Sequence, residues 1–264
     1  MGNISTKMFS IILLVAMVSC YTRKEACLDL LASNYDVSAD DACPDCCTFP
    51  KLRLEIAHLV KDSVYSVDSI YTNDLNQAFK ILDVRYYVSA FELYNQLTGK
   101  KVILEQIKNQ DSTIVIPNDI KIYRSVDGSI EIGSLKGYGT FDSLTFYLGL
   151  KDEVMQTSFI NLPSNHVLLA NNRLKNASGE YAHFTVRIQA VDTLIGVRNF
   201  QVSGLGISEP YTVKTPATTL KGAAPTFKLK ADYDALFRNI DIKDSTTVIE
   251  NALKLNIKKV LIVN

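Results

Sequence analysis

The sequence has no tryptophan, few histidines and no excess of either charge. Its 264 residues include three histidines, and 28 lysines and arginines balance 28 aspartates and glutamates. A chain that binds nucleic acid through its phosphates usually carries a basic surplus, and a cation-storage protein usually carries an acidic one. The balanced charge therefore names no partner, and we expect no nucleic-acid binding.

Motifs of enzyme active sites are absent as well. The sequence contains no G-x-S-x-G nucleophile elbow, no H-E-x-x-H zinc helix and no phosphate-binding P-loop. Asp232 and Asp234 form a pair of carboxylates, but acids spaced in this way are common as solvated side chains of turns. We therefore expect a protein that is not an enzyme and that needs no cofactor.

The first 19 residues have the pattern of a signal peptide. Lys7 precedes an apolar run over 8–17, which is too short to span a bilayer. Small residues then precede Cys20, and this segment resembles the bacterial lipobox, with Met17 in place of the usual leucine. The pattern predicts cleavage before Cys20 and attachment of lipid to its thiol, which would anchor the protein to a membrane. A soluble secreted form is the alternative.

The residues after Cys20 bear on location. Tyr21 comes next, with no aspartate, which resembles outer-membrane sorting. We therefore expect an outer-membrane lipoprotein of the cell envelope. The segment from Arg23 to Glu25 is only a weak match to a surface-export signal, so a periplasmic and a surface-facing position both stay open.

Four further cysteines lie in the segment 20–50, which we interpret as the lipid anchor and a cysteine-rich module. They are Cys27, Cys43, Cys46 and Cys47. An even number of cysteines in an oxidising compartment predicts two disulfides. A bond between the neighbours Cys46 and Cys47 would be strained, which leaves two pairings open. A zinc site is the alternative, since Cys43 and Cys46 have C-x-x-C spacing, but no second such pair is present.

Several acidic residues of this module, with one asparagine and one tyrosine, resemble a small repeat of exported bacterial proteins. They are Asp29, Asn34, Tyr35, Asp36, Asp40 and Asp41. A weak calcium site is one interpretation, because calcium prefers carboxylate oxygens. The favoured interpretation is a loop of turn-forming residues held by the disulfides.

From Leu52 onward, short runs of alternating apolar residues predict one strand after another. Predicted strands cover 52–58, 64–71, 81–94, 101–106, 113–116, 120–123, 129–135, 144–150, 184–190 and 260–263. Asp127-Gly128 predicts a hairpin turn, and residues 151–179 form a long polar connection. Regular strands without long amphipathic helices favour an all-β fold, an antiparallel β-sandwich over 51–264 with a small disulfide-stapled segment before it.

The run from Ile81 to Tyr94 is predicted to be the central strand. Its side chains alternate, and aromatic residues on both sides indicate that both faces are covered. The expected faces are Val84, Tyr86, Val88 and Ala90 on one side, and Arg85, Tyr87, Ser89 and Phe91 on the other.

The order of short motifs along the chain resembles the MbnP-like family of exported lipoproteins. The resemblance covers about residues 47–264 and is carried by Cys46 to Pro50, Leu52 to Ile56, Val84 to Ser89, Tyr147 to Leu150 and Asp232 to Phe237. Family members are β-sandwich proteins. Some are associated with copper and with a di-haem peroxidase-type cytochrome that oxidises a tryptophan to kynurenine. The resemblance thus implies an envelope protein concerned with metal binding or redox partnership.

The chain differs from these family members in the residues associated with copper and with tryptophan oxidation. Members with the copper role have a tryptophan in a segment that corresponds to Ser178 to His183, and kynurenine cannot form without it. A further His-Gly motif is replaced by Asn199 to Gly204. The sequence therefore resembles a divergent member that lacks the family's tryptophan.

The three histidines allow one metal hypothesis. His58 falls on the apolar face of its strand and is expected to be a hydrogen-bonded structural residue. His166 lies in the long connection and His183 near the start of the next strand, so the two could meet at a copper or zinc ion. Because two ligands alone bind weakly, we do not assign a metal site.

Two functions follow from the sequence. The leading one is a non-enzymatic, lipid-anchored β-sandwich of the envelope that binds or assembles with another envelope protein. The alternative is a copper-binding or redox accessory protein that works with a di-haem peroxidase-type cytochrome. The long connection and the cysteine module are the expected places for a functional site.

Overall fold

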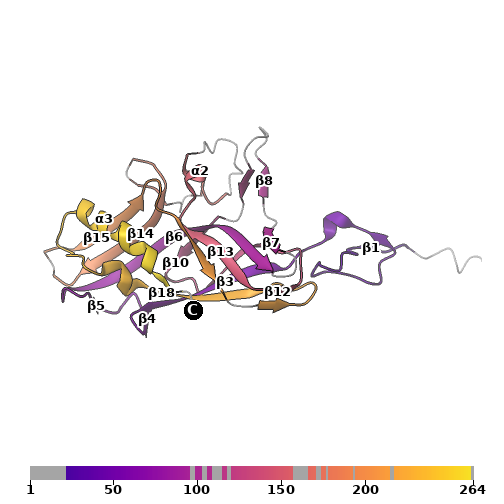
Figure 1. The fold of residues 1–264 in the computed structure, drawn as a ribbon, viewed down its shortest axis with the longest axis horizontal. Coiled ribbons are helices and arrows are strands. Elements are labelled where there is room, and N and C mark those ends of the chain that lie inside the picture. Colours follow the sequence, from indigo (N-terminus) through magenta and orange to yellow (C-terminus); the bar gives the residue numbers. More distant parts are fainter. Residues whose placement is uncertain are drawn as a thin grey trace, which may run out of the picture.

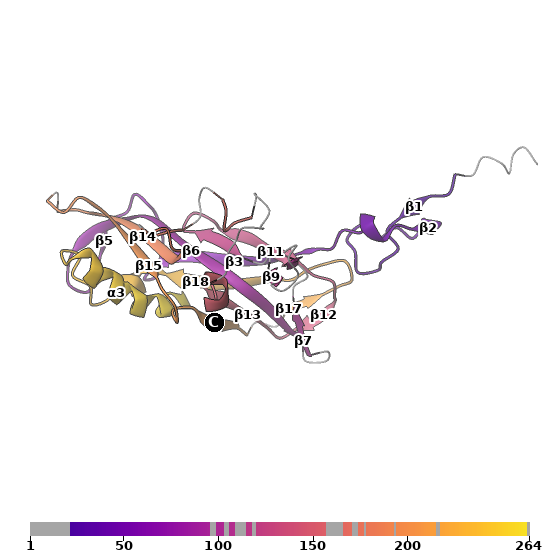
Figure 2. The same ribbon diagram turned by 90° about the horizontal axis from the view of Figure 1, so that it is seen from above.

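Two β-sheets and a separate N-terminal module make up the molecule. The structure is a computed structural model that describes residues 22–95, 99–102, 106–108, 115–117, 120–156, 166–170, 174–176, 178–192, 194–214 and 217–262. The predicted signal peptide and Cys20 lie outside these residues. The molecule is elongated, with the module at one end of its long axis and helix α3 (Thr246–Asn256) near the other (Figures 1 and 2).

The larger sheet is organised around β6 (Ala78–Asn95). All of its pairings are antiparallel. β6 pairs with β14 (Ala182–Ala190), β13 (Ser143–Leu148), β10 (Lys121–Arg124), β7 (Gly99–Val102) and β5 (Tyr71–Thr72), while β15 (Val197–Ser203) and β16 (Glu209–Val213) extend the sheet. The prediction of a central strand at 81–94 is confirmed.

The second sheet contains the strand that begins the domain and strands from its end. It consists of β11 (Ser129–Ser134), β3 (Lys51–Val60), β18 (Thr226–Asp232), β19 (Leu261–Ile262) and β4 (Ser63–Val64). β3 and β18 run parallel, with Leu54 opposite Phe227. The predicted all-β sandwich is confirmed, but its antiparallel pattern has this exception. A parallel pair needs a long connection, and most of the domain lies between β3 and β18.

Shorter elements complete the fold. They are the strand pairs β1–β2 (Glu25–Ala26, Asp41–Ala42), β8–β9 (Gln106–Lys108, Val115–Pro117) and β12–β17 (Gly139–Phe141, Ala217–Thr219), and the helical turns η1 (Pro44–Cys46), α2 (Asp152–Met155), η2 (Tyr233–Phe237) and η3 (Ile257–Lys259). None of the described helices combines the length and the apolar character that crossing a membrane would require.

The main core lies between the two sheets. β3 buries every second residue, so that Leu52, Leu54 and Ile56 face the core. Phe237 of η2 packs on Phe79 of β6, with ring centroids 4.7 Å apart. Leu253 of α3 belongs to the same core and is fully buried, which ties the C-terminal helix to the sandwich.

β6 changes the face that it presents to this core. Val84, Tyr86 and Val88 point into the core, as expected, but so do Phe91 and Leu93. The predicted placement of Phe91 opposite Tyr86 is therefore wrong. The reason is an irregularity at Ala90, which has a φ of 55° and lies where the register with β13 shifts. One extra residue at a bulge exchanges the two faces of a strand.

A second, smaller apolar cluster covers the opposite face of β6, and we call it the outer cluster. Its buried members are Tyr87, Ile120, Leu150, Leu168, Leu174, Tyr181 and Ala182. The Tyr87 hydroxyl accepts a hydrogen bond from the Leu174 backbone N–H at 3.0 Å. The described parts of the long connection 151–179 are thus packed onto the strand, which confirms that β6 is covered on both faces.

Three local predictions need correction. The chain does turn next to Asp127-Gly128, at Ser125 and Val126, but β10 before the turn pairs with β6 and β11 after it pairs with β3, so the turn joins the two sheets and is not a hairpin. The predicted strand at 64–71 is mostly turn between β4 and β5. The predicted strands omit β15, β16, β17 and β18, and no helix was predicted where α3 lies.

The N-terminal module contains one disulfide and two free thiols. Cys27 is bonded to Cys47, in agreement with one of the two pairings that the sequence left open. Cys43 and Cys46 are free, so the predicted second disulfide is absent from the structure. In η1 the Cys46 sulfur lies 3.0 Å from the Cys43 carbonyl oxygen.

Candidate functional site

His58 lies at the meeting point of the two sheets and is held on both ring nitrogens. Its Nε2 lies 2.8 Å from the Asp127 carbonyl oxygen, which can only accept, so Nε2 carries the proton. The unprotonated Nδ1 therefore accepts from the Tyr233 hydroxyl at 2.6 Å. Burial lowers the pKa of His58, which keeps the ring neutral. The expectation of a hydrogen-bonded structural histidine at position 58 is confirmed.

A series of tyrosine rings in contact extends from His58 toward the larger sheet on one side and toward the surface on the other. Toward the larger sheet, His58 lies 5.5 Å from Tyr123, and Tyr123 stacks on Tyr86 at 5.7 Å. Toward the surface, His58 stacks on Tyr233 at 5.6 Å, and Tyr65 meets Tyr233 edge-on at 5.5 Å. These separations lie within the range of direct aromatic contact. We call this continuous series the aromatic file.

The hydroxyl groups of the aromatic file differ in their partners. The Tyr123 hydroxyl accepts from the Ile56 backbone N–H at 3.1 Å, and the Tyr65 hydroxyl donates to the Ile81 carbonyl oxygen at 3.0 Å. The Tyr86 hydroxyl is buried and has no hydrogen-bond partner in the described part of the chain. Burial raises the pKa of all four tyrosines. Only Tyr233 donates its proton to a base.

His183 is fully buried beside the outer cluster, and both of its nitrogens are also occupied. Nε2 donates to the Gly204 carbonyl oxygen at 2.7 Å, and Nδ1 accepts from the Leu150 backbone N–H at 3.1 Å. The close fit depends on Gly149, since a Cβ added there would lie 2.5 Å from His183 Nδ1. Burial lowers the pKa of this histidine too.

His166 adjoins the same cluster and has one nitrogen without a partner. Its Nδ1 accepts from the Leu168 backbone N–H at 3.2 Å, so in the neutral ring the proton is on Nε2. That Nε2 is buried and has no hydrogen-bond partner among the described residues. Burial, and secondarily the charge of Lys121, lower the pKa of His166.

The fold thus brings His166 and His183 to one cluster, but not as a metal site. A neutral imidazole binds a metal through its unprotonated nitrogen. In both histidines that atom is Nδ1, and a backbone N–H already occupies it. Among the described residues, no group of three or more histidine, cysteine, aspartate or glutamate side chains is arranged to hold a metal ion.

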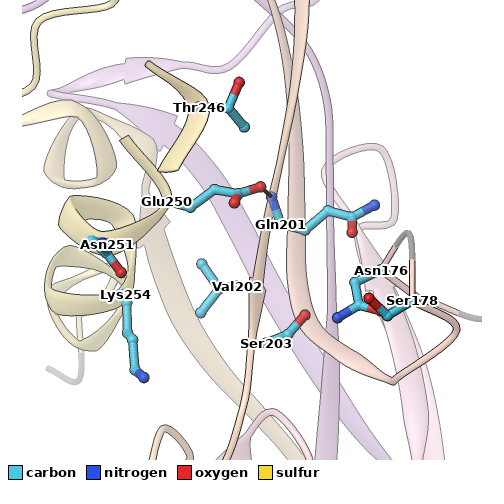
Figure 3. Close-up of a pocket in the computed structure, with 9 residues that line it drawn as sticks. All are labelled: Asn176, Ser178, Gln201, Val202, Ser203, Thr246, Glu250, Asn251 and Lys254. Carbon is cyan, nitrogen blue, oxygen red and sulfur yellow. Dashed lines mark hydrogen bonds between the residues drawn. The ribbon is translucent and has the colours of Figure 1, made fainter. Parts of the chain in front are cut away.

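A polar groove lies between α3 and β15, at the end of the molecule far from the module (Figures 1 and 3). Its volume is about 400 Å³. All of its lining residues except Val202 are polar or charged: Asn176, Ser178, Gln201, Val202, Ser203, Thr246, Glu250, Asn251 and Lys254.

Within the described structure, some polar side chains of the groove have hydrogen-bond or ion-pair partners and others do not. Glu250 reaches across from α3, and its carboxylate accepts from the Gln201 backbone N–H at 2.8 Å (Figure 3). In contrast, the Ser203 hydroxyl oxygen is buried without a partner in the described structure. Lys254 makes no ion pair with another described residue. The groove therefore offers a hydroxyl and an ammonium group to a ligand that has hydrogen-bond acceptors.

Asp36 and Asn34 of the cysteine module form their hydrogen bonds and ion pairs within the module. The Asp36 carboxylate binds Lys24 and accepts from the backbone and hydroxyl of Ser38, and these bonds lower its pKa to about 2. The Asn34 side chain bonds to the Cys46 carbonyl oxygen and the Thr48 N–H, both at 2.8 Å. These contacts support the interpretation as turn-forming residues over a calcium site.

Sequence reasoning missed both the groove and the aromatic file. The groove requires α3, whose apolar spacing of Ile249 and Leu253 was the available signal. The aromatic file joins residues that are far apart in the chain, and no local pattern links His58 to Tyr233. The signal that did exist was compositional, namely 13 tyrosines in a chain without tryptophan.

Comparison with known proteins gives one family and one structure. A model of the MbnP family matches residues 50–252. A solved structure, MbnP from Methylosinus trichosporium, is similar over 75% of this chain and 86% of that chain, with a TM-score of 0.44 and 12% sequence identity. No curated protein sequence matches the chain.

Proposed function

Because the chain belongs to the MbnP family, a family whose model covers most of its β-sandwich, we propose that it is an MbnP-like accessory protein of the cell envelope with a non-enzymatic binding role. The polar groove between α3 and β15 is the proposed binding site. One observation carries this proposal: among the described residues, Lys254 makes no ion pair and the buried Ser203 hydroxyl has no hydrogen-bond partner, and both line the groove.

The groove lies far from the proposed lipid anchor. In the proposal, Cys20 carries lipid and holds the N-terminus at the outer membrane. The module follows directly, and α3 lies toward the opposite end of the long axis (Figures 1 and 2). The groove is thereby held away from the membrane, where another envelope protein can reach it. A carboxylate or another strong acceptor on that partner would pair with the Lys254 ammonium group.

Site-specific photo-crosslinking in cells tests the binding role. A photoreactive amino acid at the exposed Asn251 is expected to give a discrete crosslinked product, because this position lines the groove. The same probe at Val126, which is 69% exposed on the turn between the sheets, is the control. Lys254→Glu is expected to remove the product. Equal products at both positions, or one unaffected by Lys254→Glu, would contradict the proposal.

A separate experiment tests the anchor. Wild-type protein is expected to incorporate radiolabelled palmitate and to sediment with membranes, whereas Cys20→Ser should lose both properties. Cys43→Ser changes an exported cysteine outside the lipobox and serves as the control. A Cys20→Ser protein that still carries lipid would disprove the assignment.

We propose a redox accessory role as the second candidate, in partnership with a di-haem peroxidase-type cytochrome. The aromatic file favours it, because tyrosine is the most readily oxidised side chain that a chain without tryptophan offers in such a series. Copper is not part of this proposal, because the unprotonated nitrogen of each buried histidine, which would bind the metal, already accepts a hydrogen bond.

A further inference from the structure

We propose that Tyr233 and His58 form a proton-coupled redox pair, and that the aromatic file conducts an oxidising equivalent between this pair and the surface. The inference deepens the second candidate function but does not depend on its partner. It rests on the 2.6 Å hydrogen bond from the Tyr233 hydroxyl to His58 Nδ1.

A base on the hydroxyl is what distinguishes Tyr233 from its neighbours. Oxidation of a phenol turns its hydroxyl into a strong acid, and a buried site disfavours the charged radical that would result if the proton stayed. The hydroxyls of Tyr65 and Tyr123 meet backbone groups, which cannot take up a proton. His58 can. The radical should therefore settle on Tyr233.

The surroundings of His58 suit both protonation states. In the neutral ring, Nε2–H donates to the Asp127 carbonyl oxygen while Nδ1 accepts from Tyr233. After proton transfer, Nε2–H keeps that bond, and the new Nδ1–H donates back to the phenoxyl oxygen. No hydrogen bond is lost in either state, so proton transfer needs no rearrangement of the core.

The aromatic file gives the electron a route out of the core. Tyr233 is fully buried, whereas Tyr65 and Tyr71 are only half-buried. Tyr65 lies 5.5 Å from Tyr233, and Tyr71 stacks on Tyr65 at 6.4 Å. Both intervals are short, ring-to-ring steps that lead from the buried pair to an accessible side chain.

The proposed oxidation removes one proton and one electron from Tyr233. The Tyr233 O–H bond breaks, its proton moves to His58 Nδ1, and its electron passes through Tyr65 to a one-electron oxidant generated from peroxide, either a ferryl haem or a peroxide-derived radical. The products are a neutral tyrosyl radical, a His58 imidazolium and the oxidant reduced by one electron. A small-molecule reductant such as ascorbate returns one electron by the same route, and the proton returns to the Tyr233 oxygen.

Electron paramagnetic resonance of the full-length chain in detergent micelles tests the pair. A photogenerated ruthenium(III) complex, with persulfate as terminal acceptor, replaces any natural oxidant. The expected result is a long-lived tyrosyl radical with a proton coupling that disappears in D₂O, as a hydrogen bond from His58 requires. Radicals on exposed tyrosines should decay rapidly in every variant.

Variants locate the radical. Tyr233→Phe is expected to lose the long-lived signal, and His58→Gln, which removes the base, to shorten its lifetime. Tyr211→Phe is the matched control, because Tyr211 packs on Phe146 and its hydroxyl lies near a carbonyl oxygen, outside the aromatic file. Thermal melting checks that each variant folds.

Three outcomes would overturn the inference: no long-lived radical in the wild type, no exchangeable coupling, or an undiminished signal in folded Tyr233→Phe. If that variant does not fold, the D₂O measurement on the wild type decides alone. A negative result leaves crosslinking at the groove unaffected, so failure of this inference and failure of the binding role are distinguishable.

Discussion

The three histidines share one tautomer. In each ring Nδ1 accepts a hydrogen bond, from a hydroxyl in His58 and from a backbone N–H in His166 and His183. Protonation of His166 or His183 at Nδ1 would set the new N–H against the N–H that now donates to it. These two rings therefore act as neutral acceptors that fix the backbone, whereas the hydroxyl beside His58 could accept a hydrogen bond from a protonated Nδ1.

Stability is expected to fall at mildly acid pH. The pKa of each histidine is lowered by burial from its ordinary value of 6.5, so the unfolded chain binds more protons than the folded chain below that pH. The free energy of unfolding should be constant above about pH 7 and decrease as the pH falls through 6.5. Urea unfolding at pH values on both sides of 6.5 measures this. Equal stability at both would contradict it.

Gly149 is expected to be intolerant of a side chain. Its φ is 102°, and an added Cβ would lie 2.5 Å from His183 Nδ1, so Gly149→Ala combines backbone strain with a steric clash. We expect a loss of about 2–4 kcal/mol of unfolding free energy. Gly196→Ala is the control, since Gly196 also has a positive φ but nothing within 4 Å. It should cost only about 1 kcal/mol. Similar losses in both variants would show that His183 is not the cause.

At the scale of elements, α3 is expected to contribute through one buried face. Leu253 is fully buried in the main core, whereas Leu255 on the same helix is 69% exposed. Leu253→Ala should cost about 2–5 kcal/mol of unfolding free energy, because it leaves a cavity against β15 and η2. Leu255→Ala should change it by less than about 0.5 kcal/mol. Chemical denaturation of both variants measures the difference, and equal effects would contradict the packing described for α3.

Several strand positions could be predicted from the sequence, but β15 to β18 and the irregularities within the strands could not. Alternation located β3, β6, β13 and β14, because a sandwich core selects apolar residues at every second position. It could not place the bulge at Ala90, since nothing in the composition near position 90 requires a left-handed φ. Phe91 was consequently assigned to the wrong face. Pairing also escaped prediction, as the parallel contact of β3 with β18 depends on residues at both ends of the domain.

The candidate sites were harder to predict than the strands because they too depend on contacts between residues far apart in the chain. The sequence suggested that His166 and His183 could meet at a metal ion, and the fold does place both histidines beside the outer cluster. Their chemistry depends on which backbone N–H reaches Nδ1, and that is decided by the folded loop. The Tyr233–His58 bond joins positions 175 residues apart and has no local signature.

At the scale of the whole molecule, the cysteine module is a separate body attached to one end of the sandwich. Lys136 links the two parts through an ion pair with Asp29 at 2.7 Å and through a contact with the Phe49 ring. Gly222 also approaches the module closely, since a Cβ added there would lie 2.9 Å from the Ala32 carbonyl oxygen. The ion pair between Lys136 and Asp29 is partly exposed.

Loss of the disulfide is therefore expected to leave the sandwich intact. Replacing Cys27 and Cys47 with serine removes the only disulfide among the described cysteines and should loosen the module. Because an exposed ion pair contributes about 0–1 kcal/mol, the unfolding free energy of the sandwich should change by no more than about 1 kcal/mol. Near-ultraviolet circular dichroism, to which the buried tyrosines of the sandwich contribute most, follows the unfolding of the sandwich. A large loss of its stability would show that the module is an integral part of the domain.

The parallel pairing of β3 with β18 also sets the order in which the protein can fold. β3 begins at Lys51, and its partner begins only at Thr226, so the second sheet lacks its centre until nearly the whole chain is present. Contacts between such distant segments slow folding because the intervening chain must first be ordered. A chain that emerges N-terminus first from a translocation channel would stay open until its last strands arrive. If the chain is exported as proposed, slow closure of the sandwich would keep its precursor unfolded during export.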